Sequence, residues 1–310
     1  HYPLRRQRQM CIRDRFLSNK FFLLLIASFL VINSCKKDDD EATIEDRDYT
    51  EQYVLDQQLI EDYLKTHFYN YKDFEKANLD NLEITLDSIY GENSNRTPLY
   101  DQIIKKKVPV IDKNGVMVDH NLYYLLAKSG LGQKPSNVDS AYVSYEGSLL
   151  NGKVFDQRKV PVWFDLAALI KGFRFGISEF QSGEYSVNND GTISFSNYSM
   201  GLLFIPSGLA YFSSAQTDIP EYSPLIFKIS LFTINESDHD FDGILSKNED
   251  IDKDGDPLND DSNGNSIPDM YDNDDDGDGI LTKNEYDQNE DGIPDDSDSD
   301  LIPDYLDTEG

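Results

Sequence analysis

The last 73 residues, from Asp238 to Gly310, hold 27 acidic side chains against three lysines, a net charge of −24. A segment with so much like charge and so little apolar surface cannot collapse around a hydrophobic core of its own. Because the whole chain carries −30, the residues before Asp238 carry only −6. The low isoelectric point therefore describes a tail, and the absence of a basic stripe with interleaved aromatic residues argues against nucleic-acid binding.

Two stretches of this tail follow a calcium-loop pattern. Asp238–Glu249 (DHDFDGILSKNE) and Asp274–Glu285 (DDDGDGILTKNE) each have Asp at positions 1, 3 and 5, Gly at 6, a hydroxyl at 9 and Glu at 12. In such a loop alternate oxygens face one centre, the glycine permits the turn, and the last Glu can bind with both oxygens. Weaker copies begin at Asp250, Asp261, Asp287 and Asp296, so that loop follows loop with no room for paired helices.

This succession resembles thrombospondin type 3 repeats, in which the chain wraps a row of calcium ions in place of an apolar core. The resemblance implies structural Ca²⁺ in residues 236–310, whereas composition alone favours a disordered acidic tail. The expected metal ligands are Asp238, Asp240, Asp242, Ile244, Ser246, Glu249, Asp250, Asp252, Asp254, Asp274, Asp276, Asp278, Ile280, Thr282, Glu285, Asp287, Asn289, Asp291, Asp295 and Asp298.

The other end of the chain carries a targeting signal. The apolar run Phe21–Ile32 is twelve residues long, too short to span a bilayer comfortably but suited to the core of a signal peptide. The sequence that ends in Ser34-Cys35 resembles a bacterial lipobox, so residues 1–34 are predicted to be a lipoprotein signal peptide and Cys35 the lipidated residue. A cleaved signal for soluble secretion is the alternative. The nine residues before Met10 do not resemble the start of a signal peptide, and we assign them no function.

Residues 35–52 are predicted to form an acidic tether. Its first part, Lys36–Glu41 (KKDDDE), resembles the surface-export signal of Bacteroidetes lipoproteins. The expected location is therefore the bacterial outer membrane, lipid-anchored and on the cell surface, with the periplasmic face as the alternative.

Residues 53–118 are predicted to be a helical region that ends in a hairpin. Apolar residues recur at helical spacing from Tyr53 to Phe68, which predicts one amphipathic helix. This helix either mediates homodimerisation or packs on its own domain. A second helix is expected near Leu79 to Tyr90, and Asp112–Gly115 reads as the turn of a hairpin.

Residues 119–235 alternate Tyr, Val, Ile and Phe with only one convincing helix, near Phe173 to Phe180. This pattern predicts an α+β fold in which an antiparallel sheet wraps around a short helix. Asn189-Asp190-Gly191 lies between alternating apolar residues and predicts an extra hairpin over Tyr185 to Tyr198. We leave open whether that hairpin grips a substrate or is a neutral decoration.

Three segments of this region resemble, in order, motifs of FKBP-type peptidyl-prolyl isomerases. They are Tyr142–Asp156 (YVSYEGSLLNGKVFD), Pro161–Phe173 (PVWFDLAALIKGF) and Ile205–Phe227 (IPSGLAYFSSAQTDIPEYSPLIF). The resemblance implies the half-barrel sheet of that family and an isomerase domain over residues 119–235. It also implies a site formed by Tyr145, Phe155, Asp156, Val162, Leu169, Ile170, Phe173, Tyr211, Ile219 and Phe227.

The resemblance implies that the Tyr211 hydroxyl and the backbone amide of Ile170 donate hydrogen bonds to substrate carbonyls. It also implies that Asp156 is the polar residue in the wall of the pocket. The chain departs from the family pattern at four positions. Phe173 replaces the usual Trp of the pocket floor, and Val162 replaces an aromatic residue. Phe212 replaces the Gly that follows the pocket tyrosine, and Asp218 replaces an apolar residue.

The expected function is peptidyl-prolyl cis-trans isomerisation in the bacterial cell envelope, which assists folding of exported proteins through their X-Pro segments. The isomerase pocket requires no cofactor, because rotation about the prolyl amide needs only differential binding of its twisted state. The rival interpretation is a surface binding or adhesion protein in which the pocket is catalytically weak and the calcium array is the working part.

Overall fold

A computed structural model of the chain describes residues 46–76 and 82–309. The predicted signal peptide, Cys35 and most of the predicted tether lie outside these residues. Within the described ranges, no helix combines the length and apolar character needed to cross a membrane.

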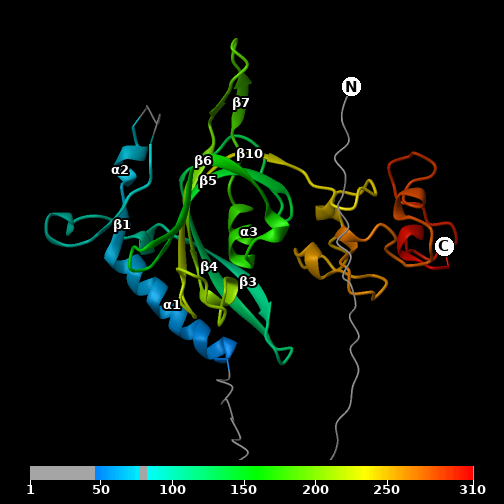
Figure 1. The fold of residues 1–310 in the computed structure, drawn as a ribbon, viewed down its shortest axis with the longest axis horizontal. Helices are drawn as coiled ribbons and strands as arrows, with labels where there is room; N and C mark the ends of the chain where they lie inside the picture. The colour runs from blue at the N-terminus through cyan, green and yellow to red at the C-terminus, as the bar shows by residue number, and fades with distance from the viewer. Residues whose placement is uncertain (1–45, 77–81, 310) are drawn as a thin grey trace, which may run out of the picture. The chain divides into compact units, whose positions relative to one another are not determined.

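A six-stranded antiparallel sheet with the order β3-β4-β9-β10-β5-β6 curls around the short helix α3 (Figure 1). Its strands are β3 (Ile104–Ile111), β4 (Met117–Lys128), β5 (Ser140–Leu149), β6 (Val154–Asp165), β9 (Ser199–Ile205) and β10 (Leu225–Asn235), and α3 spans Lys171–Ile177. The predicted antiparallel sheet with few helices is confirmed.

The sheet is covered on both faces, and the sequence of β9 is accordingly apolar on both of its faces. Leu203 and Ile205 enter the core on the side of α3, whereas Leu202 and Phe204 enter the core on the side of the N-terminal helix α1 (Tyr49–Thr66). Every residue of β9 is therefore buried, and the strand reads as a continuous apolar run rather than an alternating one.

Helix α1 begins after Asp48, whose carboxylate accepts hydrogen bonds from the backbone amides of Thr50 and Glu51. It packs on its own domain through part of the predicted apolar set, because Ile60 and Leu64 are fully buried against the sheet. The exposed fractions of three other members, Val54, Leu55 and Leu59, are 61%, 52% and 51%.

The buried face of α1 also contains the polar residues Gln52 and Asp56. Asp56 is fully buried because its carboxylate accepts hydrogen bonds from the backbone amide (2.7 Å) and the hydroxyl (2.6 Å) of Ser207. Ser207 opens the 3₁₀ turn Ser207–Leu209, so this contact fixes α1 against the loop that leads to Tyr211. Such a long-range polar contact leaves no periodic signal in the sequence.

A small layer follows α1. Strand β1 (His67–Tyr69) pairs with β2 (Leu86–Ser88), and α2 spans Tyr71–Phe74. The helix expected near Leu79 to Tyr90 is therefore wrong for residues 86–88, because these residues extend to pair with β1.

The predicted hairpin is formed by β3 and β4. Asp112 accepts hydrogen bonds from the amides of Asn114 and Val116, and Gly115 has φ +78°, which favours glycine. Strand β4 continues across residue 118, where we placed a domain boundary, and its central part pairs with β9. The hairpin thus belongs to the main sheet.

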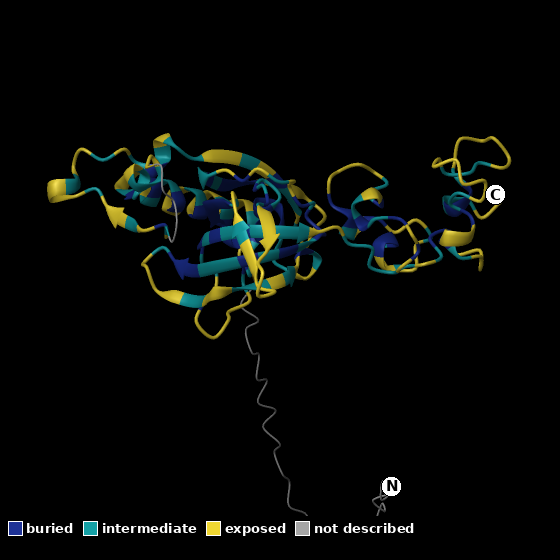
Figure 2. Ribbon diagram, turned by 90° about the horizontal axis from the view of Figure 1, so that it is seen from above, coloured by how far each residue is buried: buried dark blue, intermediate teal, exposed yellow. Residues whose placement is uncertain are grey.

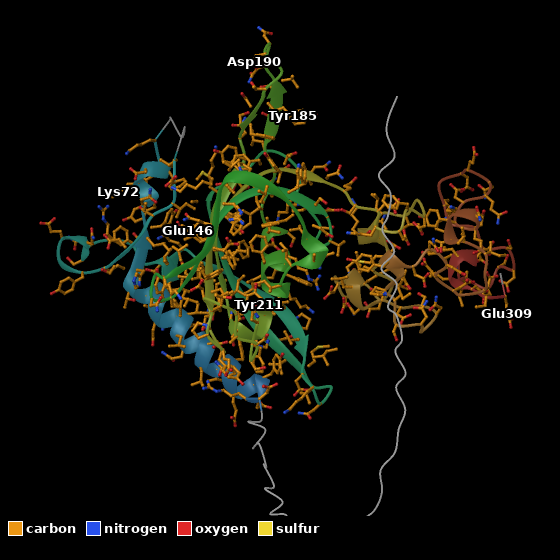
Figure 3. The ribbon with its side chains drawn as sticks, viewed as in Figure 1. Lys72, Glu146, Tyr185, Asp190, Tyr211 and Glu309 are labelled. Carbon is orange, nitrogen blue, oxygen red and sulfur yellow. The ribbon has the colours of Figure 1, made fainter. Side chains whose placement is uncertain are left out.

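The inserted hairpin consists of β7 (Glu184–Val187) and β8 (Ile193–Ser196), with Gly191 at φ +83° in its turn. Both strands are largely exposed (Figure 2), and Figure 3 places Tyr185 and Asp190 along the part that extends from the sheet. Phe195 anchors its base, with ring centroids 5.5 Å from Tyr142 and 5.6 Å from Phe232.

After β10 the chain forms successive loops joined by short 3₁₀ turns at Ser246–Asn248, Pro257–Asn259, Asp269–Tyr271, Thr282–Asn284 and Asp304–Leu306. Ser246 and Thr282 occupy equivalent positions in the two complete loops. Each hydroxyl accepts a hydrogen bond from the amide of the second loop residue, His239 or Asp275. The two loops therefore share one local geometry.

We predict a pH dependence of stability from His120, which is fully buried and whose Nε2 has no hydrogen-bond partner among the described residues. Burial lowers the pKa of His120 in the folded protein. As the pH falls below about 6.5, the unfolded chain therefore binds the proton first, and the free energy of unfolding decreases. Chemical denaturation should show that His120→Gln reduces this loss between about pH 6.5 and pH 5. An unchanged slope would contradict the assignment.

Candidate functional site

Aromatic side chains from α3, β5, β6 and β10 meet on the concave side of the sheet. Phe173 contacts Phe227 with ring centroids 5.1 Å apart at 84°, and Phe155 contacts Phe227 at 5.6 Å and 81°. These edge-to-face contacts are the geometry that aromatic quadrupoles favour. Phe173 and Phe227 are buried, and Phe155 is partly buried at the margin of this cluster.

A polar pair borders the aromatic cluster. The Tyr145 hydroxyl donates a hydrogen bond to Oδ2 of Asp156, and Nη1 of Arg158 lies 3.4 Å from Oδ1 of the same carboxylate. Burial, followed by the carboxylate partner, raises the pKa of Tyr145, so its hydroxyl stays protonated and keeps donating.

Two hydrogen-bond donors beside the cluster are unused. Ile170 caps the N-terminus of α3, and its carbonyl accepts hydrogen bonds from the amides of Phe173 (2.9 Å) and Arg174 (3.2 Å). Its own amide makes no hydrogen bond within the described residues, and neither does the hydroxyl of Tyr211. Both side chains are partly buried against the same core, and Tyr211 is labelled in Figure 3. The site can therefore bind carbonyl oxygens of an apolar ligand.

The structure brings most of the predicted site residues into this one core. Leu169 packs against it and Ile219 is buried in it. Val162 pairs with Val143 across β6 and β5, and it is Phe164 that contacts both Tyr145 (5.3 Å) and Phe173 (6.1 Å). Phe164 was absent from the predicted set because its sequence position gave no signal beyond strand alternation.

Phe212, one of the four departures from the family pattern, has a structural explanation. Its ring is buried and stacks on Tyr49 of α1 with centroids 3.9 Å apart, and it meets Tyr222 edge to face at 5.1 Å. Its backbone has φ +49°, a conformation that explains why glycine is the usual residue there. Phe212 therefore serves the contact with α1 at a position where glycine would make none.

Asp218, another departure, lies at the surface. Its carboxylate is 2.8 Å from Nζ of Lys153, and both side chains are about half exposed. An exposed pair of this kind contributes little to stability.

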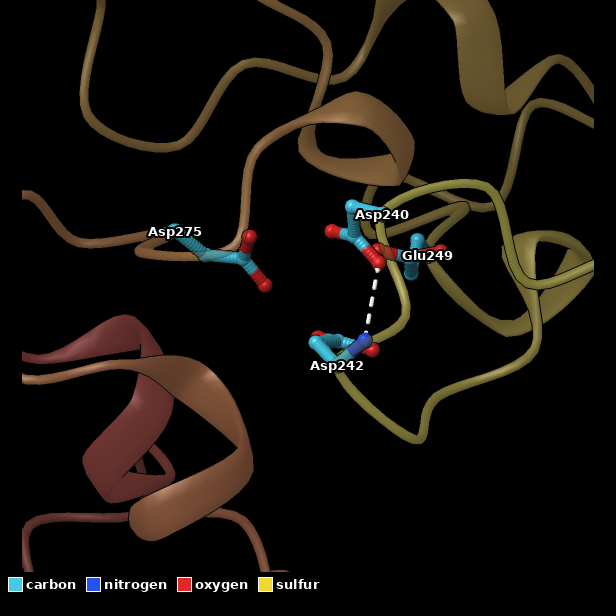
Figure 4. Close-up of side chains that lie close together, drawn as sticks. All are labelled: Asp240, Asp242, Glu249 and Asp275. Carbon is cyan, nitrogen blue, oxygen red and sulfur yellow. Dashed lines mark hydrogen bonds between the residues drawn. The ribbon is translucent and has the colours of Figure 1, made fainter. Parts of the chain in front are cut away.

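A second site lies in the acidic segment. Oxygens of Asp240, Asp242, Glu249 and Asp275 come within 4.8 Å of one another, and Figure 4 shows Asp275 facing the other three from a different stretch of chain. Glu249 is fully buried and Asp275 is 1% exposed, yet all four of their carboxylate oxygens lack a hydrogen-bond partner among the described residues. Buried carboxylates without partners are costly unless a cation binds them.

The electrostatics of this cluster agree with its geometry. Burial and the neighbouring carboxylates raise the pKa of Glu249 and of Asp275 to about 9 each. Burial and Asp242 raise the pKa of Asp240 to about 7. A divalent cation would remove this repulsion, so the residues present fit such an ion.

Other predicted ligands fall into smaller groups. Three further clusters are formed by Asp250, Asp252 and Asp254, by Asp274, Asp276 and Asp278, and by Asp296, Asp298 and Asp300. Glu285 is buried with one unpartnered oxygen, whereas Asp238 accepts from the amide of Phe241. In the loop that begins at Asp287, Asp295 accepts hydrogen bonds from Gln288 and Asn289, and Asp287 accepts from the amide of Asp291.

Five buried acids of this segment were not among the predicted ligands: Asp256, Asp260, Asp269, Asp275 and Asp304. Asp275 occupies position 2 of its loop, which the linear pattern treats as a spacer, and the fold turns it toward the other complete loop. Asp269 and Asp304 each bind the amide and hydroxyl of a serine, Ser262 and Ser297 respectively. The repeated Ile-Pro-Asp triplets, which end in Asp269, Asp295 and Asp304, were the available signal for this role.

Comparison with known proteins supports an isomerase activity. The family model of FKBP-type peptidyl-prolyl cis-trans isomerases matches residues 132–187, and the BamM C-terminal model matches residues 239–293. The chain is 33% identical over 130 residues to the peptidyl-prolyl cis-trans isomerase Mip of Chlamydia muridarum, covering 40% of this chain and 46% of that protein.

It is also 31% identical over 116 residues to the FKBP-type peptidyl-prolyl cis-trans isomerase FkpA of Escherichia coli K12, covering 36% of this chain and 37% of that protein. The crystal structure of FkpA from Escherichia coli has 27% identity and a TM-score of 0.31, covering 41% of this chain and 51% of that one. The chain thus spans about half or less of the length of these relatives.

The family model and the curated relatives support an FKBP-type peptidyl-prolyl cis-trans isomerase domain in this chain. The matched residues 132–187 include β5 and β6 of the sheet that wraps around α3, and α3 itself.

Proposed function

We propose that the chain catalyses cis/trans isomerisation of X-Pro bonds in exported proteins and so assists their folding. The observation that carries this proposal is the aromatic cluster with two unused donors, the Ile170 amide and the Tyr211 hydroxyl. Rotation about a prolyl amide faces a barrier of about 20 kcal/mol, because the planar form is stabilised by charge-separated resonance that water favours. A dry apolar pocket withdraws that solvation, and the two donors hold the flanking carbonyls while the bond twists.

We further propose that the acidic segment binds structural calcium. The site best supported is the cluster of Asp240, Asp242, Glu249 and Asp275, because six of its eight carboxylate oxygens are buried with no hydrogen-bond partner among the described residues. A Ca²⁺ ion would supply charge neutralisation there, and Asp275 would link two loops that are separate in sequence. The resemblance to thrombospondin type 3 repeats extends this proposal to the smaller acidic clusters.

The proposed location is the bacterial outer membrane, with lipid attached at Cys35 and the protein on the cell surface. The lipobox-like sequence and the Lys-Asp-rich tether support it. A homodimer through α1 is compatible with the exposure of Val54, Leu55 and Leu59. The competing interpretation, a surface binding protein with a weak pocket, predicts no catalysis and a functional role for the repeats alone.

Tyr211→Phe should lower kcat/KM for a chromogenic X-Pro peptide about tenfold, the equivalent of one hydrogen bond that matters in the transition state. Phe155→Ala should lower it at least as much, because it opens the cluster to water. Tyr90→Phe, at a side chain that is 85% exposed and outside the site, is the matched control and should leave the rate unchanged. If the unmodified protein does not accelerate isomerisation above the uncatalysed rate, the proposal is rejected. If both site variants are as active as the unmodified protein, the pocket is misassigned.

Calcium should compact the acidic segment of the full chain and protect it from proteolysis at roughly 10⁻⁴ to 10⁻³ M, the range of extracellular modules. Mg²⁺ should act poorly because it requires tighter octahedral coordination. Glu249→Gln with Asp275→Asn should weaken the response far more than Glu290→Gln with Glu309→Gln, which removes the same charge at two exposed acids. Small-angle scattering and limited proteolysis measure this, and equal responses of the two double variants would contradict the assigned site.

Cys35→Ala should release the full-length protein from the membrane fraction, since lipidation at that thiol is the proposed anchor. Detergent-free fractionation with and without the substitution tests it. Retention of the variant in the membrane pellet would show that another segment or a partner holds the protein.

A further inference from the structure

One buried ion pair links the isomerase domain to the acidic segment. Arg174 of α3 and Asp256 are each 5% exposed, and Nη2 of Arg174 lies 2.7 and 2.8 Å from the two carboxylate oxygens of Asp256. Nζ of Lys171, one turn earlier on the same helix, lies 2.9 Å from Oδ2. Although burial opposes it, hydrogen bonding and charge from these two cations lower the pKa of Asp256. Removing one partner of a buried ion pair strongly destabilises the folded protein, because the other charge is left buried without a counter-ion.

Asp256 also belongs to the acidic loop that begins at Asp250. Its amide donates to Oδ1 of Asp254 (2.8 Å), and Asp254 belongs to the cluster with Asp250 and Asp252. Asp260, 7% exposed, accepts from the amide of Asp252 and keeps an oxygen without a partner among the described residues. A cation in this loop would therefore find a buried carboxylate as well as the exposed ones.

The register of the loop separates the two roles of Asp256. If Asp250 is position 1, Asp256 is position 7, where a calcium loop supplies a backbone carbonyl and not a side chain. The carboxylate of Asp256 is thus available for Arg174 while its backbone remains part of the loop. The preceding carbonyl, of Gly255, accepts a hydrogen bond from Asn137 at 2.8 Å and fixes the loop to the domain a second time.

Helix α3 carries both elements of the isomerase site that a shift would disturb. Ile170 at its N-terminus offers the unused amide. Phe173, which lies between Lys171 and Arg174 in the sequence, contacts Phe227. With seven residues, α3 is too short to hold its conformation without tertiary contacts. Its orientation therefore depends on its tertiary contacts, which are the core packing of its apolar residues and the ion pair of Arg174 with Asp256.

We propose that Asp256 is a positioning residue for the isomerase site and that it makes this site responsive to calcium in the loop that begins at Asp250. Without a cation, repulsion among Asp250, Asp252 and Asp254 loosens the loop and the ion pair. With a cation, the loop holds Asp256 on Arg174 and Lys171, and α3 keeps the Ile170 amide and the Phe173 ring in place. This inference rests on the proposed isomerase function.

The test uses the full chain and compares Asp256→Asn with Glu290→Gln, an acid of the same segment with no assigned contact to α3. Two readouts are measured with Ca²⁺ and with chelator: kcat/KM for an X-Pro peptide, and hydrogen exchange of the α3 amides. Asp256→Asn should lower kcat/KM roughly tenfold, as expected for a misplaced donor, and should abolish the slowing of α3 exchange by calcium. Lys171→Gln should shift both readouts in the same direction by less, and Asp256→Glu should restore part of each.

Asp256→Asn behaving like Glu290→Gln in both readouts would overturn the inference. So would a wild-type α3 whose exchange is unaffected by calcium. A wild-type chain without isomerase activity would overturn the proposed function instead, and the exchange measurement would still decide whether Asp256 couples the loop to α3.

Discussion

The contact between Phe173 and Phe227 is the interaction on which the isomerase domain depends. It joins α3 to β10, which pairs with β9 on one side and β5 on the other. Phe227 lies opposite Gly147 in the register with β5. A Cβ at position 147 would lie 2.5 Å from the Phe155 ring and 2.9 Å from Phe227, so the absence of a side chain there permits the aromatic cluster to close.

The same site is tied to elements outside the family core at two places. On one side, α1 holds the loop before Tyr211 through Asp56 and Ser207, and Tyr49 stacks on Phe212 directly after Tyr211. On the other side, the acidic segment reaches α3 through Asp256. Helix α1 therefore contacts the loop that carries Tyr211, and the acidic segment contacts the helix that begins at Ile170. The contact with α1 also gives a physical reason for Phe212 in place of glycine.

Local rules predicted much of this structure. Alternation predicted the antiparallel sheet, and turn residues such as Gly115 and Gly191 marked two hairpins, because each local choice is enforced by backbone geometry. Motif order pointed to the residues that now surround Phe227. The exposure of Val54, Leu55 and Leu59 on α1 and the role of Asp275 could not be predicted, since both follow from contacts between segments far apart in sequence. Position 2 of a calcium loop carries no ligand signal until the fold brings another loop opposite it.

The apolar cluster, with two donors that bind nothing among the described residues, should accelerate prolyl rotation without a metal. Exchange spectroscopy by nuclear magnetic resonance on an X-Pro peptide, with the protein and excess chelator, measures that rotation directly at equilibrium. Exchange cross-peaks between the cis and trans resonances of the peptide should grow with protein concentration. Exchange that stays at the rate of the peptide alone, while the protein remains folded, would rule out catalysis by this cluster.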